Sequence, residues 1–258
     1  MKILIIADST STLTGSDGSS YIKKLYKLFS ANYKDVVVEC DEVSREAISQ
    51  IVPADKIMTE PYHKGTAAAI GIATAYIANE NPQELIVCIF ANQNIKYQDR
   101  LLNTIDVAKD MYKHLGKMLL VGVAITDQSS DYGYIKIGKV LQEISSLIAF
   151  EMISFKRTLS KEEKFVAHNS WQYLWDTGCL ICRAENLLEL YKDSLPEMFT
   201  GLMTIKAAIG TKFEREILNT IYSSFPRISM SSGLLEKLEP KKVAVIPVDL
   251  GISKEGQL

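Results

Sequence analysis

The sequence has little of what marks membrane, secreted or nucleic-acid-binding proteins. Its 258 residues include four cysteines, three histidines and a formal net charge of −2. No apolar run approaches the roughly 18 residues that a membrane span needs, and Asp8 ends the opening run too early for a signal peptide. A near-zero charge provides no field to attract nucleic acid or anionic lipid. We expect a cytoplasmic protein with no nucleic-acid or membrane partner.

The few cysteines and histidines also limit metal and redox chemistry. Cys179 and Cys182 have the spacing of half a zinc site, but no second pair or histidine cluster completes it. They fall in GCLICRAENLL (178–188), which is typical of a strand that runs into a helix. We interpret both as core residues in a reducing compartment. We predict no catalytic histidine.

What is present is an alternation of strands and helices over about the first 125 residues. Strands are predicted at 2–7, 36–40, 84–90 and 117–124. Helices are predicted at 19–33, 44–52, 66–79 and 97–115, with Ser44 as the N-cap of the second. Strands separated by single helices indicate a parallel, doubly wound sheet.

Beyond residue 125 the pattern indicates a mixed extension of the same sheet. Locally paired strands are predicted within 132–142 and 146–157, helices at 160–170 and 184–195, and a last strand within 241–252. There is no internal repeat and no low-complexity linker. We predict a single α/β domain over residues 1–258.

The predicted strand 84–90 ends in the polar residues Asn92 and Gln93. In α/β proteins, ligands bind at the carboxyl ends of the strands. A metal-dependent enzyme needs a carboxylate at such a position, and this chain has two amides there.

Six segments, taken in order, resemble those of one enzyme family. They are TEPYHKGTAAAIGIA (59–73), IVCIFANQNI (86–95), GVAITDQSSDYGYIKIG (122–138), QYLWDTGCLICRAENLLEL (172–190), ISMSSGLLEKL (228–238) and VAVIPVDLGISKEGQL (243–258). The chain resembles the mannose-1-phosphate guanylyltransferases, within the wider sugar-1-phosphate nucleotidyltransferases. The resemblance implies a Rossmann-like nucleotide-diphospho-sugar transferase fold, with a mostly parallel mixed sheet flanked by helices. It also implies a nucleotide-binding-type half (1–125) and a sugar-binding-type half (126–258).

The family reaction joins a sugar-1-phosphate to the α-phosphate of a nucleoside triphosphate, and two anions therefore approach each other. The resemblance assigns the magnesium ligands to two aspartates, whose positions here hold Asn92 and Lys254. At about 4 Å and an effective dielectric near 20, each charge–charge interaction is worth on the order of 4 kcal/mol. Replacing an aspartate by Lys254 turns an attraction for the metal into a repulsion. A solvated tail lysine is the alternative interpretation of Lys254.

The family's glycine-rich phosphate loop is also altered. Thr12 is retained, but Asp8, Ser9 and Ser11 stand at the three glycine positions and Leu13 at the arginine position. Glycines let backbone N–H groups approach a triphosphate, and Asp8 would repel it.

Eight positions keep a residue that could bind substrate by the resemblance. They are Thr12, Lys24, Lys64, Tyr132, Gly133, Lys156, Asp176 and Gly178. Alternatives remain for three of them. Lys24, or its neighbour Lys23, fits a solvated lysine on a basic helix face, and Asp176 with Gly178 fits a turn between helix and strand.

The departures fall on groups that handle phosphate and metal, whereas the fold-determining residues are kept. The leading hypothesis is a pseudoenzyme that binds nucleotide or sugar-1-phosphate and acts through a protein partner or as a homo-oligomer. The second is an active, divergent enzyme in which Asp127, Asp249 or Glu255 supplies magnesium ligands. The third is an interaction domain with no ligand. No cofactor is predicted, and Mg²⁺ only for the active enzyme.

Overall fold

The computed structural model describes residues 1–7, 20–126 and 132–252. Eight of the residues weighed above lie outside these ranges: Asp8, Ser9, Ser11, Thr12, Leu13, Asp127, Lys254 and Glu255. None of the helices in the described ranges has the length and apolarity to cross a membrane.

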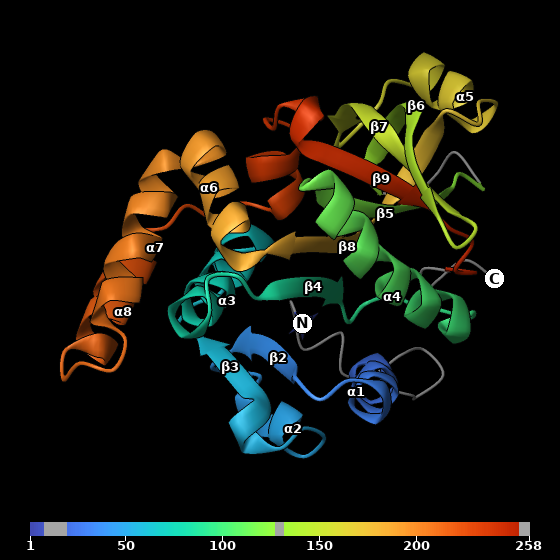
Figure 1. The fold of residues 1–258 in the computed structure, drawn as a ribbon. Helices are drawn as coiled ribbons and strands as arrows, with labels where there is room; N and C mark the ends of the chain where they lie inside the picture. The colour runs from blue at the N-terminus through green and yellow to red at the C-terminus, as the bar shows by residue number, and fades with distance from the viewer. Residues whose placement is uncertain (8–19, 127–131, 253–258) are drawn as a thin grey trace.

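One nine-stranded mixed sheet runs through the described chain, and helices flank it (Figure 1). The strands are β1 (Lys2–Ala7), β2 (Val36–Asp41), β3 (Ile57–Glu60), β4 (Leu85–Phe90), β5 (Met118–Ala124), β6 (Tyr134–Ile144), β7 (Leu147–Lys156), β8 (Tyr173–Arg183) and β9 (Val243–Pro247). Their order is β3-β2-β1-β4-β8-β5-β9-β7-β6. The predicted fold class, a Rossmann-like mixed sheet between helices, is confirmed.

The prediction of one parallel run over the first 125 residues is wrong at β5. Strands β3, β2, β1 and β4 are parallel neighbours, but β8 lies antiparallel between β4 and β5. Only β9, the last strand, pairs with β5 in parallel. Strand β8 is buried along most of its length, so its apolar residues favour the sheet centre over an edge.

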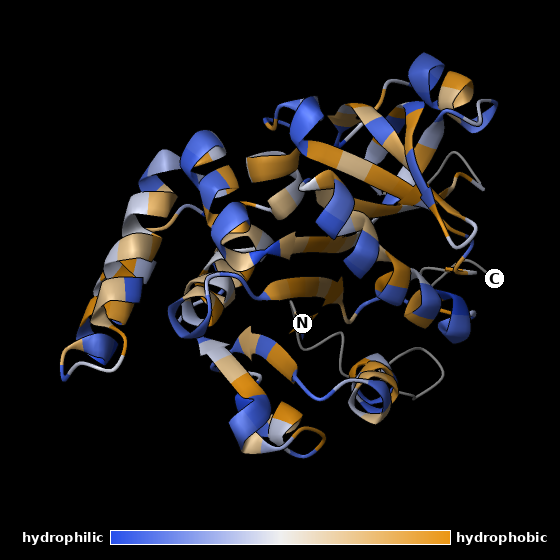
Figure 2. Cartoon of the chain, in the orientation of Figure 1, coloured by the Kyte–Doolittle hydropathy of each residue, from blue (hydrophilic) through white to orange (hydrophobic). Residues whose placement is uncertain are grey.

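Eight helices of the described ranges surround the sheet. They are α1 (Tyr21–Asn32), α2 (Arg45–Ser49), α3 (Thr66–Glu80), α4 (Gln98–Leu115), α5 (Lys161–His168), α6 (Ala184–Ser194), α7 (Pro196–Ala208) and α8 (Glu214–Ser223). Short helical turns lie at Ala54–Lys56, Ser231–Leu235 and Pro240–Lys242. Figure 2 shows apolar strands in the interior and polar residues on the outer helices.

The small residues of α3 let other helices pack closely against it. A Cβ atom at Gly71 would lie 2.9 Å from Leu202 Cδ1 of α7 and 3.3 Å from Tyr191 of α6. The Tyr191 hydroxyl also donates to the Ala67 carbonyl at 2.7 Å. The segment predicted as a small-residue helix is therefore the centre of a helical layer, beside which α7 and α8 project in Figure 1.

Two local predictions need correction, and three elements were not predicted. Helix α2 spans five residues rather than nine, and the Ser44 side chain does not cap it; instead the Ser44 N–H donates to Asp41 Oδ1 at 2.7 Å. Strand β3 and helices α7 and α8 were not predicted. The four residues of β3 are too few for a periodic pattern to stand out.

A bulge in β8 carries a glycine in the left-handed region. Between the pairs Leu120–Leu180 and Gly122–Asp176, three residues of β8 face the single residue Val121 of β5. Gly178 has φ +71°, and a Cβ atom there would collide with the Phe90 ring. The bulge therefore requires glycine for both conformation and space.

We expect Gly178→Ala to lower the free energy of unfolding by about 2–4 kcal/mol, because the left-handed conformation and the collision with Phe90 both cost energy. Gly116→Ala is the matched control, since Gly116 has φ +60° and nothing within 4 Å of the added Cβ. It should lose about 1 kcal/mol. Urea unfolding followed by circular dichroism measures both, and equal losses would contradict the packing argument.

Candidate functional site

The candidate site lies at the edge of the sheet where β4, β5 and β9 end. After β4 the chain turns through Asn92, and after β9 it returns beside this turn. The N–H groups of Lys96 and Tyr97 both donate to the Leu250 carbonyl at 3.1 Å, and Gly251 packs against the same two side chains. The two segments to which the resemblance assigned metal positions are thus neighbours, although Lys254 itself lies outside the described residues.

Of the two amides singled out after β4, Asn92 and Gln93, one is exposed and one is structural. Asn92 is exposed at the turn. Gln93 is 7% exposed, and its side-chain amide donates to the Thr177 carbonyl of β8. The Thr177 hydroxyl in turn donates to the Val121 carbonyl of β5 at 2.7 Å. Gln93 and Thr177 therefore join the three strands, whereas Asn92 and the following Asn94 are exposed to solvent.

The Trp175–Gly178 segment lies at this edge of the sheet and is part of β8. The alternative interpretation, a turn between helix and strand, is wrong, because β8 begins at Tyr173 and continues past Gly178. The Asp176 N–H donates to the Gly133 carbonyl at 2.8 Å, and the Tyr132 and Trp175 rings lie 5.3 Å apart between centroids. The structure thus brings together four predicted site residues: Tyr132, Gly133, Asp176 and Gly178.

Asp176 is a buried carboxyl group with few compensating contacts. Burial raises the pKa of Asp176 to about 6, while the Gly178 N–H, 2.9 Å from Oδ1, and the charge of Arg157 act in the opposite direction. The group therefore titrates close to neutral pH.

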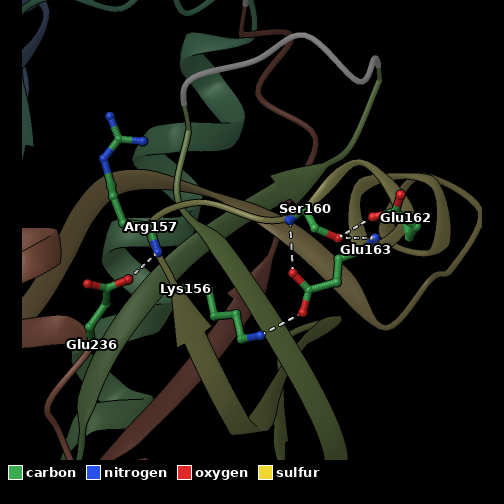
Figure 3. A network of polar contacts seen from close by, with 6 residues as sticks. All are labelled: Lys156, Arg157, Ser160, Glu162, Glu163 and Glu236. Carbon is green, nitrogen blue, oxygen red and sulfur yellow. Dashed lines mark hydrogen bonds and ion pairs between the residues drawn. The ribbon is translucent and has the colours of Figure 1, made fainter.

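Lys156 is directed to helix α5. Its ammonium group forms an ion pair with Glu163 at 2.7 Å (Figure 3). Glu163 also accepts from the Ser160 N–H at 2.9 Å in a capping box that begins α5. The lysine retained from the family motif thus serves to hold α5 against the end of β7.

Arg157 was passed over in the sequence because the family motif directs attention to its neighbour. In Figure 3 the Arg157 and Lys156 side chains leave the chain in different directions. The Arg157 charge acts on Asp176, and the Arg157 N–H donates to Glu236 at 2.6 Å. Arg157 lies one residue past the end of β7, and no local pattern in the sequence identified its role.

The other two lysines predicted to bind substrate, Lys64 and Lys24, also contact other groups of the protein. Lys64 donates to the Ser223 carbonyl at 2.6 Å, at the end of α8, where the helix dipole favours a cation. Lys24 is exposed on α1, with its ammonium group 5.5 Å from the centre of the Tyr21 ring. Neither contact tests a role in substrate binding, which remains a prediction.

A cavity of about 320 Å³ opens at the ends of β5 and β9. Its walls are mostly apolar, and the residues that line it are Val123, Ala124, Thr126, Tyr132, Leu174, Trp175, Pro247, Val248, Asp249, Gly251 and Ile252. Asp249 is the one charged side chain among these lining residues, and it forms an ion pair with Arg100 at 2.6 Å.

The sequence profile of the nucleotidyl transferase family matches residues 22–204, well over half of the chain. The chain belongs to this family.

Among curated relatives of this family member, a mannose-1-phosphate guanylyltransferase of Escherichia coli is 26% identical over 99% of the chain and 54% of its own length. Alginate biosynthesis protein AlgA of Pseudomonas fluorescens is 24% identical over 95% of the chain and 50% of its own length. The chain thus spans about half the length of the curated relatives it matches.

Solved structures agree on the fold. A structure described as mannose-1-phosphate geranyltransferase from Thermus thermophilus has a TM-score of 0.81 at 18% identity, and covers 98% of this chain and 75% of its own. A structure described as mannose-6-phosphate isomerase from Helicobacter pylori has a TM-score of 0.77 at 17% identity, and covers 98% of this chain and 100% of its own.

The described part of this family member does not fit a magnesium ion. Mg²⁺ prefers oxygen ligands from carboxylates in octahedral geometry. At this edge the exposed residues of the described ranges offer the amide oxygens of Asn92 and Asn94 and the carboxylate of Asp249, which is paired with Arg100 at 2.6 Å. The Asp176 carboxyl group at the same edge is buried. Within residues 1–7, 20–126 and 132–252 no group of three His, Cys, Asp or Glu side chains is arranged to hold a metal.

The raised pKa of Asp176 predicts a dependence of stability on pH. Because the folded-state pKa of about 6 exceeds the ordinary value of 3.8, the native state binds the proton more tightly than the unfolded chain does. Stability therefore falls as the pH rises from about 4 to about 6, by a total on the order of 3 kcal/mol. Asp176→Asn cannot ionise, so we expect it to be more stable than the wild type above pH 6 and equally stable near pH 4.

Urea unfolding at several pH values between 4 and 8 checks this. Asp110→Asn is the control, because the ion pair with Lys113 lowers the pKa of this exposed carboxyl, so its removal should lower stability slightly at neutral pH. Parallel pH profiles for Asp176→Asn and the wild type would contradict the account.

Proposed function

We propose that this chain is a mannose-1-phosphate guanylyltransferase-like protein that binds nucleotide and sugar phosphate but is impaired in nucleotidyl transfer. The observation that carries the proposal is Asn92, an exposed amide at the strand end where the resemblance places a magnesium-binding aspartate. The proposal covers one domain, with a nucleotide-binding-type half at 1–125 and a sugar-binding-type half at 126–258.

Charge explains why this substitution matters. Transfer brings a sugar-1-phosphate against a triphosphate, and a divalent cation normally offsets their charges. Asn92 supplies a neutral oxygen, and the Asp249 carboxylate is paired with Arg100. Losing one carboxylate contact to a divalent ion costs on the order of several kcal/mol at close range, which corresponds to several decades in rate.

Retained geometry supports binding. The contact between Tyr132 and Trp175, the Gly133–Asp176 hydrogen bond and the adjacent cavity form a site of a size suited to one sugar ring. Curated relatives are named mannose-1-phosphate guanylyltransferase, which favours GTP, GDP-mannose and mannose-1-phosphate as ligands. A protein that binds these without turnover would act in the cytoplasm as a regulatory or assembly partner of an active sugar-nucleotide enzyme, or as a homo-oligomer.

We expect at least one of GTP, GDP-mannose and mannose-1-phosphate to bind at millimolar concentration or below in isothermal titration. Inorganic phosphate is the control for non-specific anion binding. If inorganic phosphate gives the same heat changes, or if none of the three ligands binds, the proposal is contradicted. A ligand-free interaction domain would then be favoured.

An active, divergent enzyme is a second candidate, favoured by the position of Asp249. Its carboxylate lines the cavity beside the segment that follows β4, where it would have to take over a role lost at Asn92. This would require it to leave Arg100.

A pyrophosphate-release assay over nucleoside triphosphates and sugar-1-phosphates, with Mg²⁺ or Mn²⁺, separates the two candidates. We expect no release above background. If release occurs and Asp249→Asn lowers it at least about a hundredfold, while the exposed control Asp99→Asn leaves it unchanged, then the active enzyme replaces the leading proposal.

A further inference from the structure

A second groove lies away from the candidate site, between the end of β3 and the start of α8. Its volume is about 650 Å³, and it shares no lining residue with the cavity at the ends of β5 and β9. Three segments that are distant in the sequence line it: Glu42 and Arg45 at the start of α2, residues within 59–62, and residues within 211–219. The groove therefore exists only in the folded chain.

Three cationic side chains line this groove without a carboxylate partner. Arg45, Lys212 and Arg215 are exposed, and none of them forms an ion pair with another residue in the described part of the chain. Arg45 begins α2, whereas Lys212 precedes α8 and Arg215 lies in its first turn. The cations thus face the groove from two different helices.

The acidic residues of the groove compensate this charge only in part. Glu42 and Glu214 are the two acids among the lining residues. Both carboxylate oxygens of Glu214 already accept hydrogen bonds, from the Tyr76 hydroxyl at 2.8 Å and from the Gly210 N–H at 2.7 Å. Three cations against two acids leave the groove with a net positive charge, although the whole chain carries −2.

Exposed apolar side chains accompany these cations. Tyr62 lines the groove and is 49% exposed. Phe213 is 51% exposed, and the Lys212 ammonium group lies 4.9 Å from the centre of its ring. Val43, the neighbour of Glu42 in the sequence, is 84% exposed. Aromatic side chains beside arginines are the residues that carry most of the energy in protein–protein interfaces.

The spread of the charges indicates what kind of ligand fits. A compact anion such as phosphate is bound best where several donors converge on one point. Here the cations are exposed, come from two helices and alternate with apolar groups. An extended peptide with carboxylates spaced along it can reach several of these cations, while its apolar residues contact the exposed aromatic rings.

We propose that this groove docks an acidic segment of a partner protein, whose carboxylates pair with Arg45, Lys212 and Arg215 and whose apolar side chains cover Tyr62 and Phe213. The inference goes beyond the proposed binding of nucleotide and sugar phosphate. It does not depend on that binding, because the two sites share no lining residue.

A synthetic peptide tests the groove directly. The probe is a fluorescein-labelled octapeptide of six glutamates, one phenylalanine and one leucine, and its control has glutamine in place of each glutamate. We expect fluorescence anisotropy to show binding of the acidic peptide and not of the control. The affinity should fall as the salt concentration rises from about 50 to about 300 mM, because exposed charges are screened.

Two double variants locate the binding. Arg45→Gln with Arg215→Gln should bind the acidic peptide roughly three- to twentyfold more weakly, the effect of losing two exposed ion pairs. Lys139→Gln with Lys192→Gln is the matched control, since it removes the same charge from exposed positions outside the groove. It should bind like the wild type. Circular dichroism checks that both variants fold.

Several results would overturn the inference. One is absence of peptide binding at low salt, and another is an equal loss in both double variants, which would show attraction to overall charge alone. Displacement of the peptide by inorganic phosphate at matched ionic strength would assign the groove to a compact anion. A wild-type dimer that dissociates in the arginine variant, measured by sedimentation, would make a second copy of the chain the occupant.

Binding of mannose-1-phosphate separates this inference from the proposed function. We expect its affinity in calorimetry to be the same in the wild type and in both double variants. A loss confined to the arginine variant would overturn the inference, because the groove would then belong to the ligand site. If mannose-1-phosphate, GDP-mannose and GTP all fail to bind while the acidic peptide binds through the arginines, the proposed function fails and the docking site stands.

Discussion

The bulge in β8 is the constraint on which the candidate site depends. It carries the backbone of Thr177 into the space between β4 and β5, where polar groups are removed from water and must be paired. Gln93 bonds the Thr177 carbonyl, and the Thr177 hydroxyl bonds Val121 and accepts from the Cys179 N–H. These contacts connect the turn that follows β4 to β5 through β8, an antiparallel strand from the other half of the chain.

The same bulge determines the chemistry on either side of it. On one side Asp176 is buried deeply enough for its pKa to rise to about 6. On the other side the buried Trp175 indole nitrogen has no hydrogen-bond partner among the described residues. Both groups differ from the surface residues around them because the sheet, rather than solvent, surrounds them, and an interior of low dielectric makes each buried polar group costly unless a partner is supplied.

Positive charge at this edge is largely engaged in holding the fold together. Arg100 neutralises Asp249, Lys156 pairs with Glu163, and Lys64 caps α8. A protein that performs phosphoryl chemistry keeps such charges directed at the substrate. Here the described charges are paired within the protein, which agrees with the proposed impairment of nucleotidyl transfer.

Apolar periodicity and the ordered motifs were enough to predict the alternating elements, the mixed sheet and the family, because burial of apolar surface depends on local spacing that a sequence displays. The family resemblance, rather than spacing, assigned Tyr132, Gly133, Asp176 and Gly178 to one site, because their two motifs are more than 40 residues apart in the sequence. The insertion of β8 between β4 and β5, the structural use of Gln93 and the direction of the Lys156 and Arg157 side chains were decided only by the tertiary structure. They depend on contacts between residues up to 98 positions apart, such as Leu85 and Arg183, and no local pattern records which strand a distant segment will join.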